Sequence, residues 1–248
     1  MAGRDGQPTS ESAYYLCANR NKRSIEIDLA SPDGQALILR LLANADVLIE
    51  NYKVGGLAAY GLSYAQLKDK FPRLIYCSIT GFGQTGPYAS RAGYDFLIQG
   101  MGGIMSLTGT PDGEPMRIGV ALADVMAGMY ASVGILAALR HRDQTGQGQY
   151  IDISLLDTQV ALLINTATNF FTTQKDPQRW GNGHPNIVPY QVFPTADDPI
   201  IVAVGNDSQF RKLCEAIGRP EIASNPNYAT NAGRVQHRQQ VIAALEAA

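Results

Sequence analysis

The chain has 248 residues, of which 45% are hydrophobic and 17% charged, a balance that excludes a disordered or fibrous protein and allows a substantial buried core. Its formal net charge of −2 argues against a surface built to hold a nucleic-acid backbone. The polar N-terminal stretch lacks the apolar core of a secretory signal, and the three cysteines lack metal-ligand spacing, which favours a reducing, cytoplasmic location.

The first part of the chain alternates between strand and helix patterns. Ser31 as a cap and Pro32 as the first helical residue mark the start of one helix. Alternating or continuous apolar runs predict the remaining elements: strands over 24–29, 47–49 and 74–79, and a second helix over 64–70. This order predicts an α/β fold, with a Rossmann-like parallel sheet, right-handed crossovers and flanking helices.

A glycine-rich hexapeptide, Gly81 to Gly86, follows the third predicted strand and matches the dinucleotide fingerprint G-x-G-x-x-G. That fingerprint needs a helix beginning at the turn and an acid about 20 residues further on. Pro87 and Tyr88 follow instead, and the acid is missing at that distance, so a nicotinamide or flavin site is not favoured. The preferred interpretation is a loop at the carboxyl end of a strand, which is where α/β proteins place ligands.

The sequence pattern of the second part of the chain changes near residue 179. Before it, the patterns predict a helix over 94–105, a turn over 109–113, a long apolar helix from 120, a strand over 149–153 and a helix over 153–173. After it, a polar loop leads to a predicted hairpin of strands 188–193 and 200–204, followed by helices over 208–217 and from 234 onward. We therefore expect a large α/β domain over 1–178 and a smaller α+β domain over 179–248.

The stretch from Val120 to Leu139 is apolar and long enough to cross a membrane. It carries one acid, Asp124, and several small residues, and no second apolar segment supports a membrane protein. Because an acid inside a bilayer is costly, a buried core helix is the preferred interpretation and no membrane partner is expected.

Asp124 is the most unusual chemical feature of the chain, and the residues alone leave two interpretations open. As a structural acid it would cap its helix by accepting a hydrogen bond from a free backbone amide. As a functional acid it would attack a carbonyl carbon, with the helix dipole keeping it ionised. Caps far outnumber nucleophiles, so the pattern by itself favours the cap.

Other polar residues give weaker indications. His184, between a glycine and a proline, is as consistent with a turn as with a ligand contact. Lys53, in a loop after a predicted strand, could hold a phosphate or be an ordinary polar residue. With only three histidines, a Ser-His-Asp triad or a histidine-rich metal site is poorly supported, and no metal is expected.

Several motifs in a fixed order resemble the class III CoA-transferase (CaiB/BaiF) family from about Ser12 onward. The matching segments are Asn19–Ile25, Ala45–Tyr52, Gly93–Asp95, Ala123–Asp124 and Thr145–Gln149. The resemblance implies that Asp124 is a nucleophile that attacks an acyl-CoA thioester. CoA then returns to form an aspartyl-CoA thioester, from which an acceptor carboxylate takes it. CoA would be a substrate, with no permanently bound cofactor, and the family suggests an interlocked homodimer.

The same resemblance assigns further site residues. It places the CoA site at Ile27, Asp28, Leu29, Ala30, Asn51, Tyr52, Lys53, Ala92, Gly93, Tyr94 and Asp95. It also implies that backbone amides of a glycine loop stabilise oxyanions or cover the acyl group, at Gly181, Asn182, Gly183 and His184.

Two departures from the family pattern concern the phosphate contacts. Ala30 and Ala59 stand where formyl-CoA transferases have basic residues, so Lys53 and the basic cluster Arg20–Arg23 are the expected substitutes. α-Methylacyl-CoA racemases of the same superfamily have a His-Asp pair that corresponds to Tyr94-Asp95. Because tyrosine is a poor base near neutral pH, transfer is favoured and racemisation is the alternative.

The segments 174–181 and 184–191 look most like the succinate–hydroxymethylglutarate/glutarate subgroup, which implies dicarboxylate substrates. Family members are longer at both ends, so the chain is expected to be truncated on each side. A CoA-binding or inactive remnant is therefore a further alternative.

Overall fold

The core of the fold is a three-stranded parallel sheet in a computed structural model that describes residues 6, 7, 9 and 12–248. Its strands are β1 (Val47–Glu50), β2 (Ile75–Thr80) and β3 (Tyr150–Ser154), in the order β1-β2-β3. Val47 lies opposite Ile75, and Tyr76 opposite Tyr150. The predicted parallel sheet is confirmed, and each of these strands lies close to where its apolar run places it.

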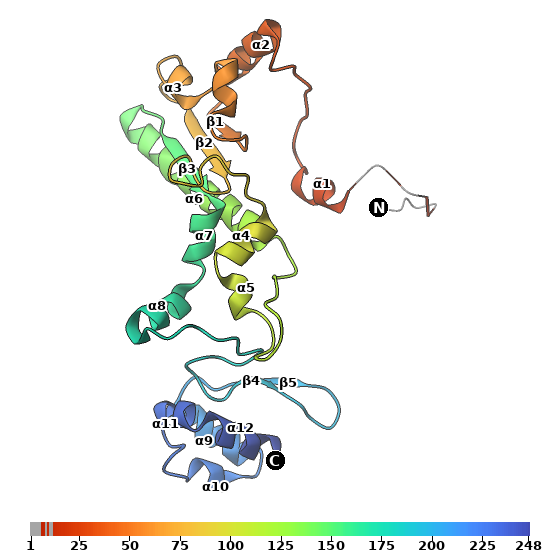
Figure 1. The fold of residues 1–248 in the computed structure, drawn as a ribbon, viewed down its shortest axis with the longest axis vertical. Helices are drawn as coiled ribbons and strands as arrows, with labels where there is room; N and C mark the ends of the chain where they lie inside the picture. Colours follow the sequence, from red (N-terminus) through yellow and green to blue (C-terminus); the bar gives the residue numbers. More distant parts are fainter. Residues whose placement is uncertain (1–5, 8, 10–11) are drawn as a thin grey trace.

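Helices cover both faces of this sheet, because successive side chains of a strand point to opposite sides. On one face Tyr76 packs with side chains of α2 (Pro32–Leu42), η1 (Gly56–Tyr60) and α3 (Tyr64–Leu67). On the other face Ile79 packs with α4 (Asp95–Met101), α6 (Leu122–Thr145) and α7 (Leu155–Ala161). This three-layer arrangement occupies the upper part of Figure 1.

The start of α2 follows the prediction. The Ser31 hydroxyl accepts a hydrogen bond from the Gly34 amide at 3.0 Å, and Pro32 is the first helical residue. Gly34 is required there because a Cβ would lie 1.9 Å from the Asp28 carbonyl oxygen. The turn Asp28–Ser31 is therefore fixed against the first turn of the helix.

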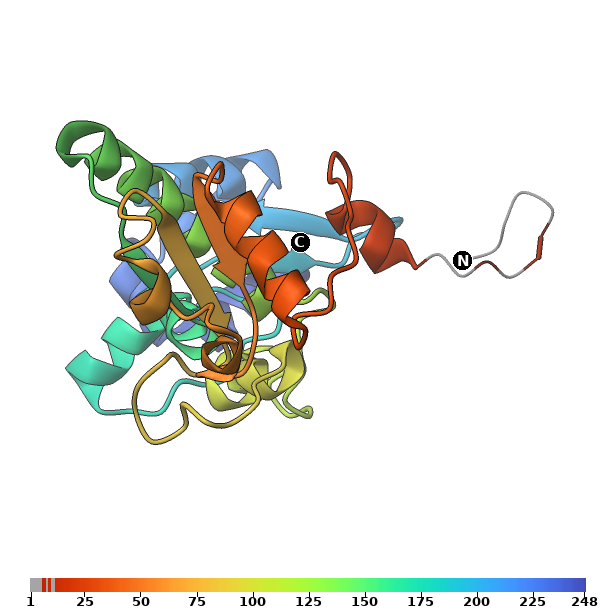
Figure 2. The same ribbon diagram turned by 90° about the horizontal axis from the view of Figure 1, so that it is seen from above.

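Four predicted elements differ in the structure. The helix predicted from 234 onward is divided at His237 into α11 (Asn231–Gln236) and α12 (Arg238–Glu246). Residues 24–29 form no strand: the segment is extended and Ile25 is 63% exposed, since no described strand lies beside it to complete a ladder. The helix predicted over 94–105 is split into α4 and α5 (Ile104–Leu107) by Gly102–Gly103. The helix predicted over 153–173 is split into α7 and α8 (Ile164–Thr173). An unpredicted short helix, α1 (Ala13–Ala18), stands away from the body in Figure 2.

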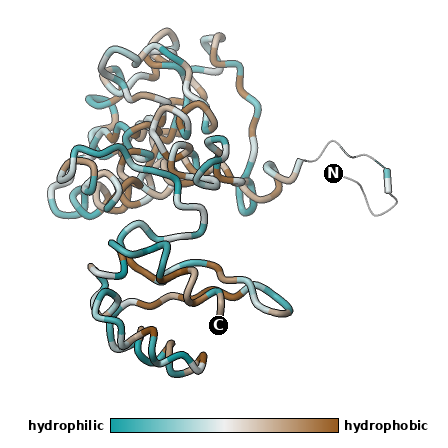
Figure 3. Tube along the Cα trace, turned by 60° about the horizontal axis from the view of Figure 1, so that its bottom comes forward, coloured by the Kyte–Doolittle hydropathy of each residue, from teal (hydrophilic) through white to brown (hydrophobic). Residues whose placement is uncertain are grey.

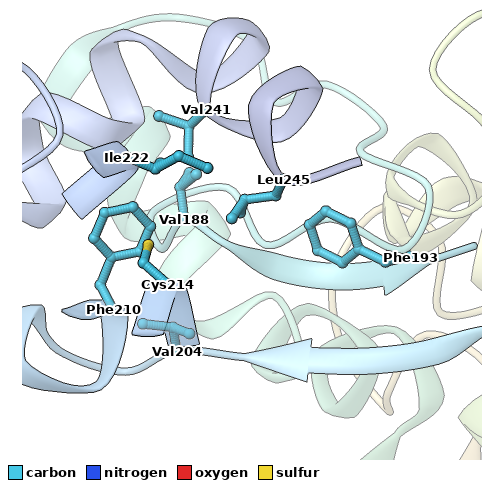
Figure 4. Packing of buried hydrophobic residues seen from close by; sticks show 8 residues of the cluster. All are labelled: Val188, Phe193, Val204, Phe210, Cys214, Ile222, Val241 and Leu245. Atoms are coloured by element: carbon cyan, nitrogen blue, oxygen red, sulfur yellow. The ribbon is translucent and has the colours of Figure 1, made fainter. Parts of the chain in front are cut away.

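The C-terminal part forms its own hydrophobic cluster. The antiparallel hairpin of β4 (Tyr190–Phe193) and β5 (Ile200–Ala203) confirms the predicted pair of strands. It packs with α9 (Asp207–Ala216), α10 (Pro220–Ala223), α11 (Asn231–Gln236) and α12 (Arg238–Glu246). Figure 4 shows the eight buried members, Val188, Phe193, Val204, Phe210, Cys214, Ile222, Val241 and Leu245. In Figure 3 a largely white-to-teal, more polar segment joins this part to the rest.

Helix α6 is buried on one side only. Small side chains spaced at helical intervals, among them Ala123, Ala127 and Ala131, are buried and allow close approach to its neighbours. Val125, Met129, Val133 and Leu136 are exposed, so the prediction of a buried core helix holds for one face and is wrong for the other. By length and composition alone, α6 is the single described helix that could cross a membrane, and the same test is passed by core helices.

Candidate active site

A small cavity of ≈190 Å³ lies where the loops after β1 and β2 meet. Six of the residues predicted to bind CoA line it: Asn51, Tyr52, Lys53, Ala92, Gly93 and Tyr94. The two groups are about 40 positions apart in the chain, and the parallel sheet brings them to one edge. We call this cavity the strand-end cavity. Its position at the carboxyl ends of the strands is the usual ligand site of α/β sheets.

The loops around the strand-end cavity are fixed by specific contacts. The Asn51 side-chain amide donates to the Ile79 carbonyl oxygen, which ties the end of β1 to the end of β2. The Tyr52 amide donates to the Glu50 carboxylate at 2.7 Å. Gly81 and Gly93 touch backbone to backbone, since a Cβ on Gly81 would lie 2.5 Å from the Gly93 Cα.

We expect Gly93→Ala to lower stability by about 1–3 kcal/mol, because the new methyl must displace the backbone at Gly81. The shifted loops should also weaken CoA binding, which calorimetry measures alongside the thermal midpoint. Gly128→Ala is the matched control: its Cβ would meet nothing within 4 Å, and it lies inside helix α6. That control should gain up to about 1 kcal/mol from helix propensity. Equal stability of Gly93→Ala and wild type would contradict the close contact.

Two cations border the strand-end cavity, Lys53 and Arg91. Arg91 was not predicted from the sequence; its guanidinium carbon lies 4.6 Å from the centre of the Tyr88 ring, which holds the side chain at the rim. In the sequence, the position of Arg91 two residues before the Gly93-Tyr94 motif could have indicated a second cation at the site. Thr80 also lines the cavity, and its buried hydroxyl has no hydrogen-bond partner among the described residues.

The remaining predicted CoA residues do not line this cavity. Ile27, Asp28, Leu29 and Ala30 form the turn before α2, where the Asp28 carboxylate accepts from the Ala30 amide at 2.9 Å. Asp95 follows Tyr94 in the chain but directs its carboxylate to α6. The structure therefore separates the predicted CoA set into a cavity group, a turn group and one residue that contacts another helix.

Asp124 does not cap its helix. Helix α6 begins at Leu122, so Asp124 is its third residue, and the residue at the cap position, Ala121, makes no side-chain cap bond. The cap comes from another helix: the Asp95 Oδ1 atom accepts from the Ala123 amide at 2.8 Å and from the Asp124 amide at 3.4 Å. The capping role favoured by the sequence pattern is wrong, because a distant carboxylate already fills it.

The Asp124 carboxylate is left exposed in the first turn of α6, where the Asp124 backbone amide is hydrogen-bonded to Asp95. No described residue donates a hydrogen bond to the carboxylate, and Asp95, the residue that holds its helix end, is adjacent to Tyr94 of the strand-end cavity. Partial burial raises the pKa of the Asp124 carboxyl above its ordinary value, and the nearby Asp95 carboxylate raises it further. The helix dipole, which was expected to keep the acid ionised, acts in the opposite direction to these two effects.

The predicted glycine loop lies at a different cavity. Gly181 and Gly183 line a cavity of ≈850 Å³ with residues of α8, α11 and α12, and Asp124 does not line it. The amides of Gly181, Gly183 and His184 donate to the carbonyl oxygens of Gly109, Trp180 and Tyr190. These three amides are therefore occupied within the chain, and Asn182 has the one amide of the four without such a backbone partner. The His184 Nδ1 atom accepts from the Asn186 amide at 3.0 Å, as expected for a turn.

The loop Gly81–Gly86 has the structure of a packing loop. The helix required by a dinucleotide site does not begin there, as predicted. The Gln84 amide donates to the Asp152 carboxylate at 2.9 Å, which ties the loop to β3. Across the described residues, no group of three or more potential metal-ligating acids, histidines or cysteines comes together.

The fold and the strand-end cavity define an α/β protein with a candidate ligand site at the sheet edge, and comparisons with known proteins identify its class. Residues 2–248 match the model of CoA-transferase family III. The chain belongs to that family. It is 55% identical to a succinate–glutarate CoA-transferase of Agrobacterium fabrum over 96% of the chain. It is 45% identical to the succinyl-CoA:glutarate CoA-transferase of Homo sapiens over 95% of the chain.

A crystal structure of a CAIB/BAIF family protein from Brucella suis is similar in fold, with a TM-score of 0.80 and 53% identity over 95% of this chain. The chain spans 59% of the Agrobacterium relative, 54% of the human one and 62% of the Brucella chain. The family expected from the sequence motifs is confirmed.

Proposed function

We propose that the protein transfers CoA between an acyl-CoA thioester and a free carboxylate, with Asp124 as the covalent nucleophile. The observation that carries this proposal is the placement of Asp124. Its carboxylate is exposed in the first turn of α6 and accepts no hydrogen bond from a described residue. Its backbone is fixed by Asp95, which directly follows Tyr94 of the strand-end cavity in the chain.

The reaction follows from carboxylate chemistry. A carboxylate oxygen of Asp124 attacks the thioester carbonyl carbon, the C–S bond breaks, and a mixed anhydride and CoA thiolate form. The thiolate attacks the aspartyl carbonyl of the anhydride, which releases the donor acid and leaves an aspartyl-CoA thioester. The acceptor carboxylate attacks this thioester to form a second anhydride. The released thiolate then attacks the acceptor's acyl carbon, which frees Asp124 and completes the new acyl-CoA.

The strand-end cavity supports the assignment of CoA binding. CoA carries phosphates, and Lys53 and Arg91 supply two cations at the rim. The exposed rings of Tyr52 and Tyr94 provide apolar surface beside them. These contacts take the place of the basic residues that Ala30 and Ala59 do not provide.

The substrates we propose are small dicarboxylates, because relatives at 55% and 45% identity are named for succinate and glutarate. We also propose a homodimer in the cytoplasm, without a membrane or nucleic-acid partner. The division into a large domain over 1–178 and a smaller one over 179–248 belongs to the same proposal. It is supported by the hydrophobic cluster drawn entirely from residues 188–245.

The pH dependence follows from the pKa of Asp124. The nucleophile must be ionised, and its pKa is raised by partial burial and by Asp95. We expect the rate of Asp124 acylation to fall as the pH is lowered through this raised pKa, at a pH above the ordinary range of an aspartate. Single-turnover rates across the acid range measure this limb, and Asp95→Asn should move it to lower pH. A limb at or below the ordinary value would contradict the assigned environment.

The test of the proposed function is to find the covalent intermediate. The protein is mixed with succinyl-CoA and digested, and the peptide that contains Asp124 is weighed by mass spectrometry. The expected result is a CoA adduct on that peptide, which hydroxylamine removes. In a separate, undigested sample, addition of glutarate should give glutaryl-CoA. Incorporation of solvent deuterium at the α-carbon of a branched acyl-CoA, without transfer, would indicate a racemase instead. CoA binding without either reaction would indicate a binding remnant.

A further inference from the structure

Gln99 on helix α4 is completely buried, and its side-chain amide connects α4 to the segment that enters α6. The Nε2 atom donates to the Asp95 Oδ2 atom at 2.7 Å and to the Val120 carbonyl oxygen at 3.3 Å. The Oε1 atom accepts from the Ile118 amide at 2.9 Å. Both the nitrogen and the oxygen of the amide are therefore hydrogen-bonded to protein atoms.

These bonds continue directly to the helix that carries Asp124. The Oδ1 atom of Asp95, the oxygen that Gln99 does not contact, accepts from the amides of Ala123 and Asp124. Asp95 and Gln99 are four residues apart on α4, so both side chains lie on one face of that helix. Gln99 thus orients the carboxylate that caps α6 and also holds the segment Ile118–Val120 that enters α6.

We propose that Gln99 is a positioning residue for Asp124. Its amide fixes the Asp95 carboxylate against the first turn of α6 and holds the segment that leads into that turn. The inference rests on the proposed CoA transfer and adds to it a residue that touches no substrate.

Only a neutral side chain with both a donor and an acceptor can donate to the Asp95 carboxylate and accept from the Ile118 amide. A glutamate in the same place would accept from the Ile118 amide, but when ionised it could not donate to Asp95 and would repel it. When protonated it could do both. The ionisable residues on α4, in the first turn of α6, on α7 and in the segment 116–121 are Asp95, Asp124, Asp157 and Arg117. Of these, Asp95 is the one hydrogen-bonded to Gln99, and the Arg117 guanidinium lies over the Phe96 ring.

The experiment compares Gln99→Glu and Gln99→Met in the purified full chain, using succinyl-CoA and glutarate. For Gln99→Met we expect kcat to fall by about 100-fold with KM for succinyl-CoA unchanged, because Asp124 is displaced while CoA binding is not touched. For Gln99→Glu we expect the ratio of its kcat to that of wild type to decrease as the pH rises. A residue that only fills space would show no such pH signature.

The matched control is Gln159→Met on helix α7. Gln159 is also completely buried, but its side-chain oxygen and nitrogen have no hydrogen-bond partner among the described residues. The substitution removes the same amide at the same depth without breaking a described bond, so kcat should stay close to wild type. Near-UV circular dichroism checks that each variant is folded. If Gln99→Met does not fold, Gln99→Glu at acid pH, where the neutral acid keeps both bonds, supplies the test.

A pH-independent ratio for Gln99→Glu, or equal effects of Gln99→Met and Gln159→Met, would overturn the role of Gln99. If the wild type forms the Asp124 adduct in either case, the proposed function stands and this inference alone fails. A wild type without the adduct overturns both. The double variant Gln99→Met/Asp95→Asn gives an independent check, since residues that act through one another have non-additive effects on kcat.

Discussion

Asp124→Asn is expected to abolish CoA exchange, with a loss in kcat of about 10⁴-fold or more, because the amide cannot form the anhydride. CoA binding should persist, since Asp124 does not line the strand-end cavity. The adduct on the Asp124 peptide should disappear. Asp124→Glu keeps a carboxylate but displaces it along a longer side chain, so a loss of about 100-fold is expected. Steady-state kinetics, calorimetry with CoA and peptide mass spectrometry measure the three effects.

The chain supplies a matched control for this substitution. Asp157 is also the third residue of its helix, α7, and its carboxylate is exposed. Asp157→Asn makes the same chemical change at the same helical position and should leave kcat within about twofold of wild type, as for a surface substitution away from the site. If Asp124→Asn transferred CoA at the wild-type rate, the nucleophile would have to be another residue.

Arg234→Met is expected to cause the largest loss of stability, about 3–5 kcal/mol, because Arg234 is completely buried at the centre of the C-terminal part. Its guanidinium donates to the Val188 and Tyr228 carbonyl oxygens and to the Asp207 carboxylate at 2.9 Å. It also lies over the Phe210 ring, with 4.4 Å from its carbon to the ring centre. Removing it leaves buried carbonyl groups without donors. Urea denaturation followed by fluorescence or circular dichroism measures the change.

Two comparisons isolate the contribution of Arg234. Asp207→Asn removes only the charge of its one acidic partner, whose side chain is 43% exposed, so a smaller loss of about 1 kcal/mol is expected. Arg211→Met replaces an exposed arginine of α9 and should change stability by less than about 0.5 kcal/mol. If Arg234→Met were as harmless as Arg211→Met, the buried network would not hold this part together.

The sequence predicts the parts of the fold that depend on local patterns. The apolar runs of β1, β2 and β3 and the Ser31-Pro32 start of α2 are found as expected. The segment 24–29 has a strand pattern of equal quality, but a strand also needs a neighbour, and alternation within one segment cannot supply it. The break at Gly102–Gly103 was visible as a pair of glycines, yet helical periodicity continues through it and hides the interruption.

Long-range contacts explain what the sequence could not predict at the site. The placement of Asn51–Lys53 beside Ala92–Tyr94 follows from parallel strands, and the family resemblance was sufficient to find it. The cap of α6 comes from Asp95, 28 residues before the amide that it accepts from, and no local rule connects the two. The local pattern therefore assigned the capping role to Asp124, and the buried amide of Gln99 carried no chemical signal at all.

Helix α6 is held at both ends by carboxylates from other segments. At its start Asp95 accepts from the first-turn amides, and near its end the Arg142 guanidinium pairs with Asp46, just before β1, at 2.9 Å. Each residue advances a helix by about 1.5 Å and turns it by about 100°. The number of residues between these two anchors is therefore a fixed dimension of the molecule. A single inserted or deleted residue would rotate the first turn, which carries Asp124, away from Asp95 or would break the anchor at Arg142.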